Sequence, residues 1–380
     1  MLHGNAPWFP SAYGQQLRLL GKQLCGLGHD VAFSANFGLH GAGLNYDGAP
    51  VFPAADGNNA AGCSLLPGHA EKWRADLVIA LGDAWYWPAA VMRELPCKLA
   101  LWMPIDCAPL GAMDRAACAQ LPDAQLIAMS THGVNELEAE GFDATYIPHA
   151  FDPAVYKPHD SQLRALQRAN LGIAPDEFAI GICAANKDTV RKGFTEQFRA
   201  FADFHTSHPN SRLMVHAMPD ASQGGIDLRA LAGLLDISDA VTFPSPYALS
   251  TGLYGGPAMA EWFNALDLLS SCSWGEGFGV PVIEAQACGT PVVSANFAGQ
   301  ASLPATWRVH GDPWWIDAHK AWWQRPNVAE IQGAYEDAIH QWGPRLRDEA
   351  AAAVQDFAAP RVASSWDAFL QAQGLVLQHA

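Results

Sequence analysis

The segment from 266 to 294 constrains the fold of this chain more than any other. It begins with an apolar run, 266–273, that is typical of a buried strand in a parallel sheet. A loop with Glu276 and two glycines follows, and then a helix of small and apolar residues that carries Glu284. The run 290–294 predicts the next strand. This order of strand, glycine loop, helix and strand predicts one unit of a parallel α/β sheet.

The glycine loop has the chemistry of a ligand site. The first turn of a helix exposes unpaired backbone N–H groups that attract anions, and Gly277 and Gly279 let a ligand come close to that backbone. Two carboxylates at this position would repel a phosphate unless they contact neutral hydroxyl groups instead. The segment therefore predicts a ligand with both kinds of group, such as a nucleotide diphosphate that carries a sugar.

From Glu276 to Glu284 the segment resembles the E-x7-E signature of retaining glycosyltransferases of family 4, which have the GT-B fold. The resemblance implies that Glu276 contacts the donor sugar and that Glu284 binds the ribose hydroxyl groups. It also implies backbone N–H contacts to the donor from Phe278, Gly279 and Val280. An ordinary strand–loop–helix unit with solvated carboxylates is the alternative.

A basic cluster is expected to hold the diphosphate. Lys187, Arg191 and Lys192 follow the predicted strand 178–184 closely, in a chain with only 22 Lys and Arg residues. The cluster resembles the phosphate-binding stretch of the same family, and Lys192 matches the family lysine. Either Arg191 or Lys187 is the second cation, and the sequence does not decide between them. A solvated loop is the alternative.

Three further candidates lie in the first half of the chain. Gly14, at the start of the first predicted helix, resembles the family glycine that approaches the donor phosphates or the acceptor, although a plain capping loop is an alternative. Asp106 follows the predicted strand 98–103 and is expected either to touch the acceptor or to cap the next helix. His132 follows the predicted strand 125–129 and is a candidate hydrogen-bond partner of the sugar or acceptor, although a lone histidine is more often structural.

The whole chain alternates strands and helices, which predicts an α/β protein with parallel sheets and helices on both faces. The predicted strands are 31–35, 76–81, 98–103, 125–129, 145–147, 178–184, 212–217, 240–243, 266–273 and 291–295. A proline-rich turn segment, 148–158, predicts a domain boundary. We therefore expect two Rossmann-like, doubly wound domains that face a cleft: 1–153 on the acceptor side and 154–359 for the nucleotide sugar. The GT-B resemblance further implies that a C-terminal helix within 360–380 packs back on the first domain.

Composition excludes some classes of function. The formal net charge is −16, which disfavours generic binding to nucleic acid or anionic lipid. No apolar run reaches the roughly 18 residues that span a membrane, and the first residues do not resemble a signal peptide. The eight cysteines are scattered without C-x-x-C pairs, which is typical of reduced thiols. We therefore expect a cytoplasmic protein without a transmembrane segment.

Several common site motifs are missing from the sequence. It contains no P-loop, no G-x-G-x-x-G after the first strand, no H-E-x-x-H and no D-x-D pair. No metal site and no cofactor are therefore predicted, since lysine, arginine and helix N-termini can neutralise a departing diphosphate. A late aromatic cluster is more typical of core or partner-facing positions than of sugar stacking. It comprises Trp307, Trp314, Trp315, Trp322 and Trp323.

Together with the resemblance, these features predict a metal-independent, retaining glycosyltransferase of the hexosyltransferase type that uses a nucleotide-diphosphate sugar as donor. The sequence does not specify the base, the sugar or the acceptor, which is a saccharide, a lipid-linked molecule or a small molecule. The alternatives on the same fold are a nucleotide-sugar epimerase, a sugar phosphorylase and a non-catalytic nucleotide-sugar-binding protein. A transferase that modifies nucleic acid bases is a further alternative, which the net charge disfavours.

Overall fold

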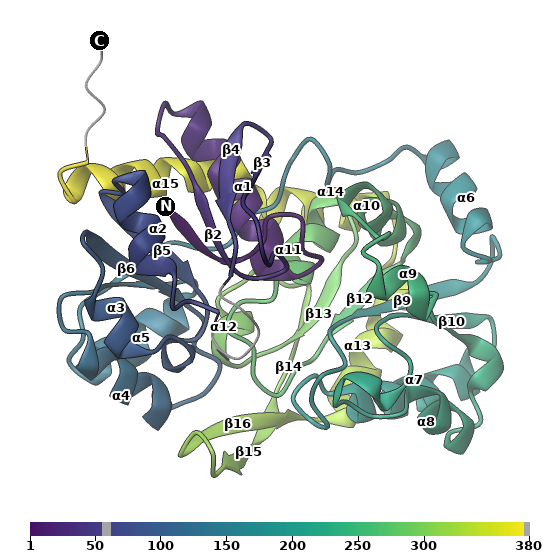
Figure 1. Ribbon diagram of the computed structural model, residues 1–380. Helices are drawn as coiled ribbons and strands as arrows, with labels where there is room; N and C mark the ends of the chain where they lie inside the picture. The colour runs from purple at the N-terminus through teal and green to yellow at the C-terminus, as the bar shows by residue number, and fades with distance from the viewer. Residues whose placement is uncertain (55–61, 376–380) are drawn as a thin grey trace. The chain divides into compact units, whose positions relative to one another are not determined.

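The computed structural model describes residues 1–54 and 62–375, and the chain forms two compact units (Figure 1). Unit 1 comprises Met1–Ala150, Ile316–Ala321 and Phe357–Ala380, and unit 2 comprises Phe151–Trp315 and Trp322–Asp356. The chain passes from unit 1 to unit 2 after residue 150 and returns to unit 1 after residue 356. Both positions lie three residues before the boundaries expected from the sequence. The short exchange at Ile316–Ala321 was not expected.

Unit 1 contains an eight-stranded sheet of order β3-β4-β2-β1-β5-β6-β7-β8. Its strands are β1 Leu2–Asn5, β2 Phe33–Phe37, β3 Leu44–Tyr46, β4 Ala49–Phe52, β5 Leu77–Leu81, β6 Lys98–Met103, β7 Gln125–Ala128 and β8 Ala144–Tyr146. β3 and β4 pair antiparallel at one edge, and the other pairs are parallel. Parallel strands need crossover connections, which the helices of this unit provide.

The helices of unit 1 include the C-terminal helix. They are α1 Ala12–Gly26, α2 Leu66–Trp73, η1 Ala84–Tyr86, α3 Ala89–Arg93, α4 Ala112–Gln120, α5 Thr131–Ala139 and α15 Ala359–Ala372. α15 packs on α1, and the ring of its Trp366 lies 5.0 Å from that of Trp102 on β6. Both rings are fully buried, so the C-terminal helix completes the core of the N-terminal domain as expected. Residues 376–380 of the expected helical segment lie outside the described residues.

Unit 2 contains a six-stranded parallel sheet of order β11-β10-β9-β12-β13-β14. Its strands are β9 Phe178–Cys183, β10 Ser211–His216, β11 Val241–Thr242, β12 Leu268–Ser271, β13 Val292–Ala295 and β14 Trp307–Val309. A separate hairpin consists of β15 Gly311–Ile316 and β16 Ala321–Pro326. β9 and β12 are hydrogen-bonded neighbours, so the loops after their carboxyl ends lie at the same edge of the sheet.

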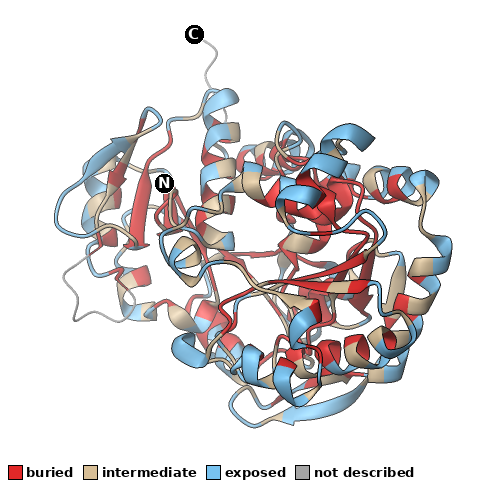
Figure 2. Ribbon diagram, turned by 90° about the vertical axis from the view of Figure 1, so that its right-hand side faces the viewer, coloured by how far each residue is buried: buried red, intermediate tan, exposed pale blue. Residues whose placement is uncertain are grey.

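Helices cover the sheet of unit 2. They are α6 Ser161–Asn170, α7 Phe194–Ser207, α8 Leu228–Leu234, α9 Pro246–Ser250, α10 Gly256–Ala265, α11 Val280–Ala287, α12 Ala298–Ala301, α13 Val328–Gln341 and α14 Pro344–Ala353, with 3₁₀ turns at Ala221–Gln223, Ser238–Ala240 and Gln355–Phe357. Phe194, Phe198, Phe201 and Phe204 recur every three or four residues on α7, so all four lie on its buried face. Figure 2 shows buried strands under helices whose outer faces are exposed.

All ten predicted strands form, with ends that differ by no more than two residues from the prediction. β1 was not predicted, although it lies at the centre of its sheet. Its sequence is short and contains His3, which is buried and whose Nδ1 atom donates a hydrogen bond to the Ser34 carbonyl oxygen at 2.9 Å. Burial lowers the pKa of His3 to about 3, so the ring is neutral. The short strands β3, β4 and β14 and the aromatic hairpin were also missed.

Candidate functional site

Lys192 and Glu276 meet at the carboxyl ends of β9 and β12. Lys192 lies in the turn before α7, Glu276 lies in the loop after β12, and Lys192 Nζ donates a hydrogen bond to Glu276 Oε2. The two side chains are 10% and 20% exposed, so the ion pair is largely shielded from water. Two residues that the sequence analysis assigned from separate motifs are therefore brought into direct contact.

Arg191 joins the same pair. Its Nη1 atom lies 3.8 Å from Glu276 Oε2 and donates a hydrogen bond to the Gly275 carbonyl at 3.3 Å. The backbone ties the two loops together as well, because the Trp274 N–H group donates to the Arg191 carbonyl at 2.8 Å. Lys187 is exposed. Of the two cations left open by the sequence, the structure thus places Arg191 beside Glu276.

The charge of this cluster favours an anion. Burial alone would raise the pKa of Glu276, but Lys192 and then Arg191 outweigh burial, and the pKa lies below its ordinary value. Glu276 is therefore ionised at neutral pH. Two cations surround one carboxylate, so one positive charge is available to an anionic ligand.

Gly193 fixes the turn that presents Lys192. It has a φ of 60° and is the N-cap residue of α7. A Cβ atom at this position would lie 2.2 Å from the Cys272 carbonyl oxygen. Only glycine combines this left-handed conformation with so close an approach between the two loops.

Glu284 lies on the first turns of α11 and is buried. The Tyr156 hydroxyl donates a hydrogen bond to its carboxylate. Burial raises the pKa of Glu284 to about 8, although the bond from Tyr156 lowers it in part. Burial and the nearby Glu284 also raise the pKa of Tyr156. Tyr156 was missed from the sequence, since its distance along the chain from Glu284 follows no motif spacing.

The residues between the two glutamates form the start of α11. Phe278 is buried, and Gly279 has a φ of 105° at the N-cap position before Val280. No side chain caps this helix, so its first turn has the character of an anion site. The Gly299 N–H group donates to the Glu276 carbonyl at 2.8 Å and thereby holds the loop. Gly299 was another residue missed by sequence reasoning.

Gly14 lies in the first turn of α1 in unit 1, and Ser11 is the N-cap residue of this helix. The N–H group of Gly14 donates to Ser11 Oγ at 3.1 Å. A Cβ atom on Gly14 would lie 2.7 Å from the Phe9 carbonyl oxygen and 2.8 Å from that of Ala6. This geometry agrees with the capping loop that was the alternative for Gly14, and a role in donor binding stays a prediction.

Asp106 and His132 also belong to unit 1, and they follow two neighbouring strands, β6 and β7. His132 Nε2 lies 3.0 Å from the Cys107 carbonyl oxygen, and Nδ1 lies 4.0 Å from Glu136 Oε1. These contacts hold the imidazole ring in place. Asp106 is half-buried in the loop that carries Cys107. The acceptor-binding role of both residues stays a prediction.

The late tryptophans divide into two groups. Trp314, Trp315 and Trp322 on the β15–β16 hairpin are 48%, 43% and 43% exposed, whereas Trp323 is buried. The hairpin is tied to the strand-end loops, because the Gln324 N–H group donates to the Trp274 carbonyl at 3.0 Å. This loop carries Glu276 two residues later.

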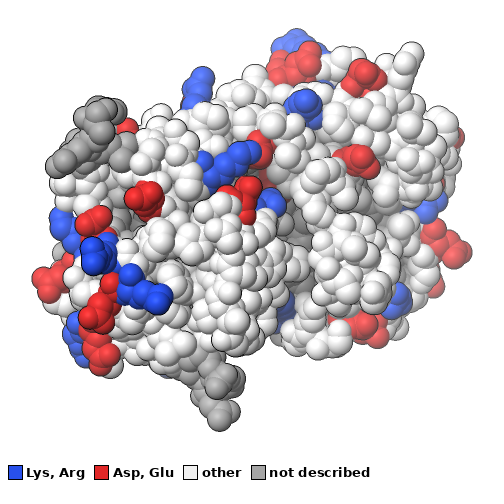
Figure 3. All heavy atoms as spheres, turned by 45° about the horizontal axis from the view of Figure 1, so that its top comes forward, with Lys and Arg blue, Asp and Glu red and all other residues white. Residues whose placement is uncertain are grey.

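Residues 1–54 and 62–375 contain neither a cluster of metal ligands nor a membrane-spanning helix. No group of three or more histidine, cysteine or acidic side chains has the arrangement of a metal site. No helix in this part of the chain has the length and hydrophobicity to cross a bilayer. On the face drawn in Figure 3, Lys and Arg lie among Asp and Glu and do not gather into an extended basic surface.

Comparison with known proteins shows that part of the chain matches a known family. Residues 180–314 match the family model described as "Glycosyl transferases group 1", and this segment includes Lys192, Glu276 and Glu284. The D-inositol 3-phosphate glycosyltransferase of Stackebrandtia nassauensis is 34% identical over 178 residues. This alignment covers 45% of the present chain and 38% of that enzyme, so the chain matches well under half the length of its relative.

Solved structures resemble the whole chain. Sucrose-phosphate synthase from Thermosynechococcus elongatus has a TM-score of 0.77 at 16% identity and covers 98% of each chain. Anabaena Alr3699/HepE in complex with UDP-glucose has a TM-score of 0.72 at 17% identity and covers 98% of this chain and 99% of that one. At such identities the likeness shows the fold, which is the GT-B fold predicted from the sequence.

Proposed function

We propose that this protein is a glycosyltransferase that transfers a sugar from a nucleotide-diphosphate sugar to an acceptor. The observation that carries the proposal is the cluster of Lys192, Arg191 and Glu276 at the carboxyl ends of two adjacent parallel strands. The match of residues 180–314 to the group 1 glycosyl transferases supports it, because the cluster lies within that segment.

Lys192 and Arg191 would stabilise the departing diphosphate. Negative charge grows on the diphosphate as the bond to the sugar breaks, through a transition state that resembles an oxocarbenium ion. Cations that are already fixed in a shielded site stabilise this charge without a reorganisation cost. In the free protein, Glu276 neutralises one of them and keeps the lysine in place until the donor binds.

Glu276 would then orient the sugar, and Glu284 would hold the ribose. The pKa of about 8 keeps Glu284 largely protonated near neutral pH, and a protonated carboxyl group both accepts and donates hydrogen bonds, which suits a ribose diol. The contact of Tyr156 with Glu284 supports this role, since a hydroxyl group already pairs with the carboxyl group in the free protein. The start of α11, with Phe278, Gly279 and Val280, would offer backbone N–H groups to the donor.

The stereochemistry and the metal requirement are part of the same proposal. We propose retention by front-face attack that the departing phosphate assists, since this route needs no dedicated nucleophile. We also propose that Lys192 and Arg191 take the charge-neutralising role without a metal. Asp106 and His132 would contact the acceptor, and the reaction would take place in the cytoplasm. The acceptor remains to be identified.

The experiment starts from UDP sugars, since the Anabaena relative was crystallised with UDP-glucose. Calorimetric titration of the purified chain with nucleotides and nucleotide sugars identifies the donor. Turnover is then measured as nucleoside diphosphate release with candidate acceptors, and products are analysed for the anomeric configuration. Conversion of donor without acceptor would indicate an epimerase, and a requirement for inorganic phosphate would indicate a phosphorylase. Donor binding without any turnover would leave only a binding protein.

A further inference from the structure

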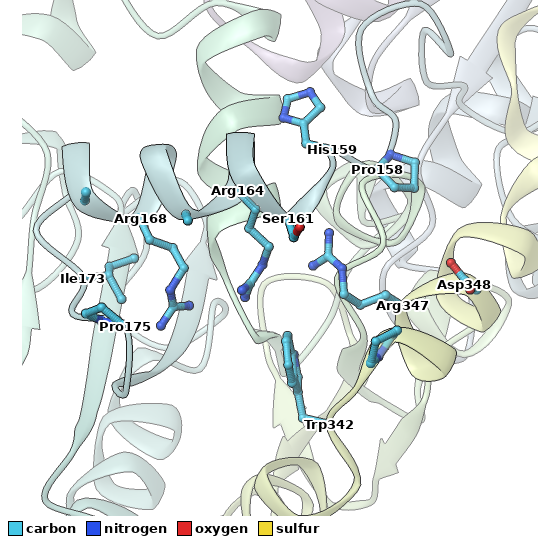
Figure 4. A pocket seen from close by; sticks show the side chains of 13 residues that line it. Pro158, His159, Ser161, Arg164, Arg168, Ile173, Pro175, Trp342, Arg347 and Asp348 are labelled. Atoms are coloured by element: carbon cyan, nitrogen blue, oxygen red, sulfur yellow. The ribbon is translucent and has the colours of Figure 1, made fainter.

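Unit 2 contains a second pocket that shares no residue with the proposed donor site. It lies between α6 and α14, has a volume of about 440 Å³, and is lined in part by Pro158, Ala165, Ile173 and Trp342 (Figure 4). This volume is sufficient for a small metabolite. The apolar lining suits a ligand with an uncharged body.

Three arginines also line this pocket. Arg164 and Arg168 extend from α6, and Arg347 extends from α14 toward the space between the two helices (Figure 4). Asp267 Oδ1 lies 2.6 Å from Arg164 Nη2, and its Oδ2 lies 2.9 Å from Arg168 Nη1. The single carboxylate of Asp267 thus forms ion pairs with both guanidinium groups.

Arg347 bonds to neutral groups instead. Its Nη2 atom donates to Asn264 Oδ1 at 3.3 Å and to the Cys288 carbonyl at 3.1 Å. The residue is more than nine-tenths buried, and its Nη1 atom has no hydrogen-bond partner among the residues that the structure describes. A buried cationic donor without a partner is costly, and an anion at this position would remove the cost.

The charges at the pocket are also unbalanced. Three guanidinium groups lie at the pocket with two carboxylates, those of Asp267 and the exposed Asp348. One positive charge is therefore in excess there, although the net charge of the chain is −16. Burial and then the nearby Arg164 lower the pKa of Arg347 to about 10, so the group is still charged at neutral pH. The neighbouring pocket of 430 Å³ shares Arg164, Arg168 and Trp342 with this one. Arg347 does not line it, and three carboxylates do, those of Asp176, Glu177 and Asp267.

We propose that the pocket between α6 and α14 binds a small organic anion whose phosphate or carboxylate group lies between Arg347 and Arg164. Guanidinium groups bind both kinds of anion through paired N–H donors. The Arg164 guanidinium stacks on the Trp342 ring with 4.9 Å between its central carbon and the ring centroid, which holds it in place. The body of the ligand would rest on the apolar wall of the pocket. This site is independent of the proposed glycosyl transfer.

The first test uses Ala165→Glu, which places a carboxylate from the exposed face of α6 into the mouth of the pocket. Leu166→Glu is the matched control, since Leu166 is 58% exposed on the same helix but does not line the pocket. Affinity for inorganic phosphate is measured by calorimetry at constant ionic strength. We expect Ala165→Glu to weaken binding about tenfold or more, because its carboxylate repels the bound anion, and Leu166→Glu to have little effect.

The second test uses Arg347→Gln with Arg345→Gln as control, because Arg345 lies on the same helix and its side chain is 92% exposed. Glucose 6-phosphate, citrate and neutral glucose are titrated as well, so that the phosphate and carboxylate sources are distinguished. The proposal would be overturned if the affinity for phosphate were unchanged in both Ala165→Glu and Arg347→Gln. It would also be overturned if the control variants Leu166→Glu and Arg345→Gln weakened phosphate binding equally. Binding that Lys192→Gln alone abolishes would also overturn it, because the phosphate then occupies the donor site.

Discussion

Lys192 and Glu276 are 84 positions apart in the chain and form one largely buried ion pair. Each lies in the loop between a strand and the next helix, and the two strands, β9 and β12, are neighbours in a parallel sheet. Because the carboxyl ends of parallel strands meet at one edge, the pairing of these strands is sufficient to bring the two loops together. The ion pair at the proposed site for the donor diphosphate is therefore a consequence of the pairing of β9 with β12.

Lys192→Ala should lower kcat more than it raises the KM for the donor. The lysine interacts most strongly with the diphosphate when its charge is greatest, in the transition state. We expect a loss of about 10²–10³-fold in kcat, by analogy with the loss of one donor from an oxyanion hole. Steady-state kinetics measure the effect, with Lys187→Ala as the control, since Lys187 is exposed. Equal activity of the two variants would remove Lys192 from the site.

Glu284→Ala should weaken binding of the nucleotide about two- to tenfold, because a neutral hydrogen-bond partner of the ribose, worth about 0.5–1.5 kcal/mol, is lost. Calorimetric titration with the nucleoside diphosphate checks this prediction. Tyr156→Phe keeps the carboxylate and removes only the hydroxyl group that bonds to it. Its nucleotide affinity should stay close to that of the wild type. A nucleotide affinity of Glu284→Ala equal to that of the wild type would contradict the proposed ribose contact.

Glu284 should also make stability depend on pH. Folding raises its pKa from an ordinary value of 4.5 to about 8, so between these values the folded state holds a proton that the unfolded state has lost. The free energy of unfolding contributed by this group therefore falls as pH rises from 4.5 to 8. Urea unfolding of the wild type and of Glu284→Gln at several pH values isolates the effect. If the free energies of unfolding of the two proteins differ by the same amount at every pH, Glu284 does not titrate in this way.

Gly193→Ala should both destabilise the protein and reduce activity. Its Cβ atom would meet the Cys272 carbonyl at 2.2 Å, and the strain would displace the turn that carries Lys192. Gly172→Ala is the control, since Gly172 has a φ of +71° but open space around its Cβ position. A strained backbone alone costs about 1 kcal/mol or more, and the clash at Gly193 should exceed this. Equal unfolding midpoints in urea would contradict the argument.

Activity should survive an excess of EDTA, because Lys192 and Arg191 supply the positive charge that a metal provides elsewhere. The assay is nucleoside diphosphate release before and after chelation, with a coupled enzyme that needs no metal. Complete loss of activity, restored by Mg²⁺ or Mn²⁺, would show that the proposed charge balance is wrong.

Local sequence patterns were sufficient to predict the alternation of strands and helices, the ends of ten strands to within two residues, and the two loops that carry the candidate site residues. These features depend on local periodicity and on glycine and proline at fixed positions, which act within a few residues. The long strands β6 and β9 were therefore placed accurately. β1 was missed because its short, partly polar sequence is buried only through contacts with distant strands.

Which of these residues come into contact depends on the tertiary structure. It placed Arg191 rather than Lys187 beside Glu276, and it brought Tyr156 to Glu284. It also gathered the arginines of α6 and α14 around one pocket, although no sequence motif joins them. The physical reason is that strand order and helix packing set contacts between residues far apart in the chain, and the pKa values follow from the burial that this packing creates.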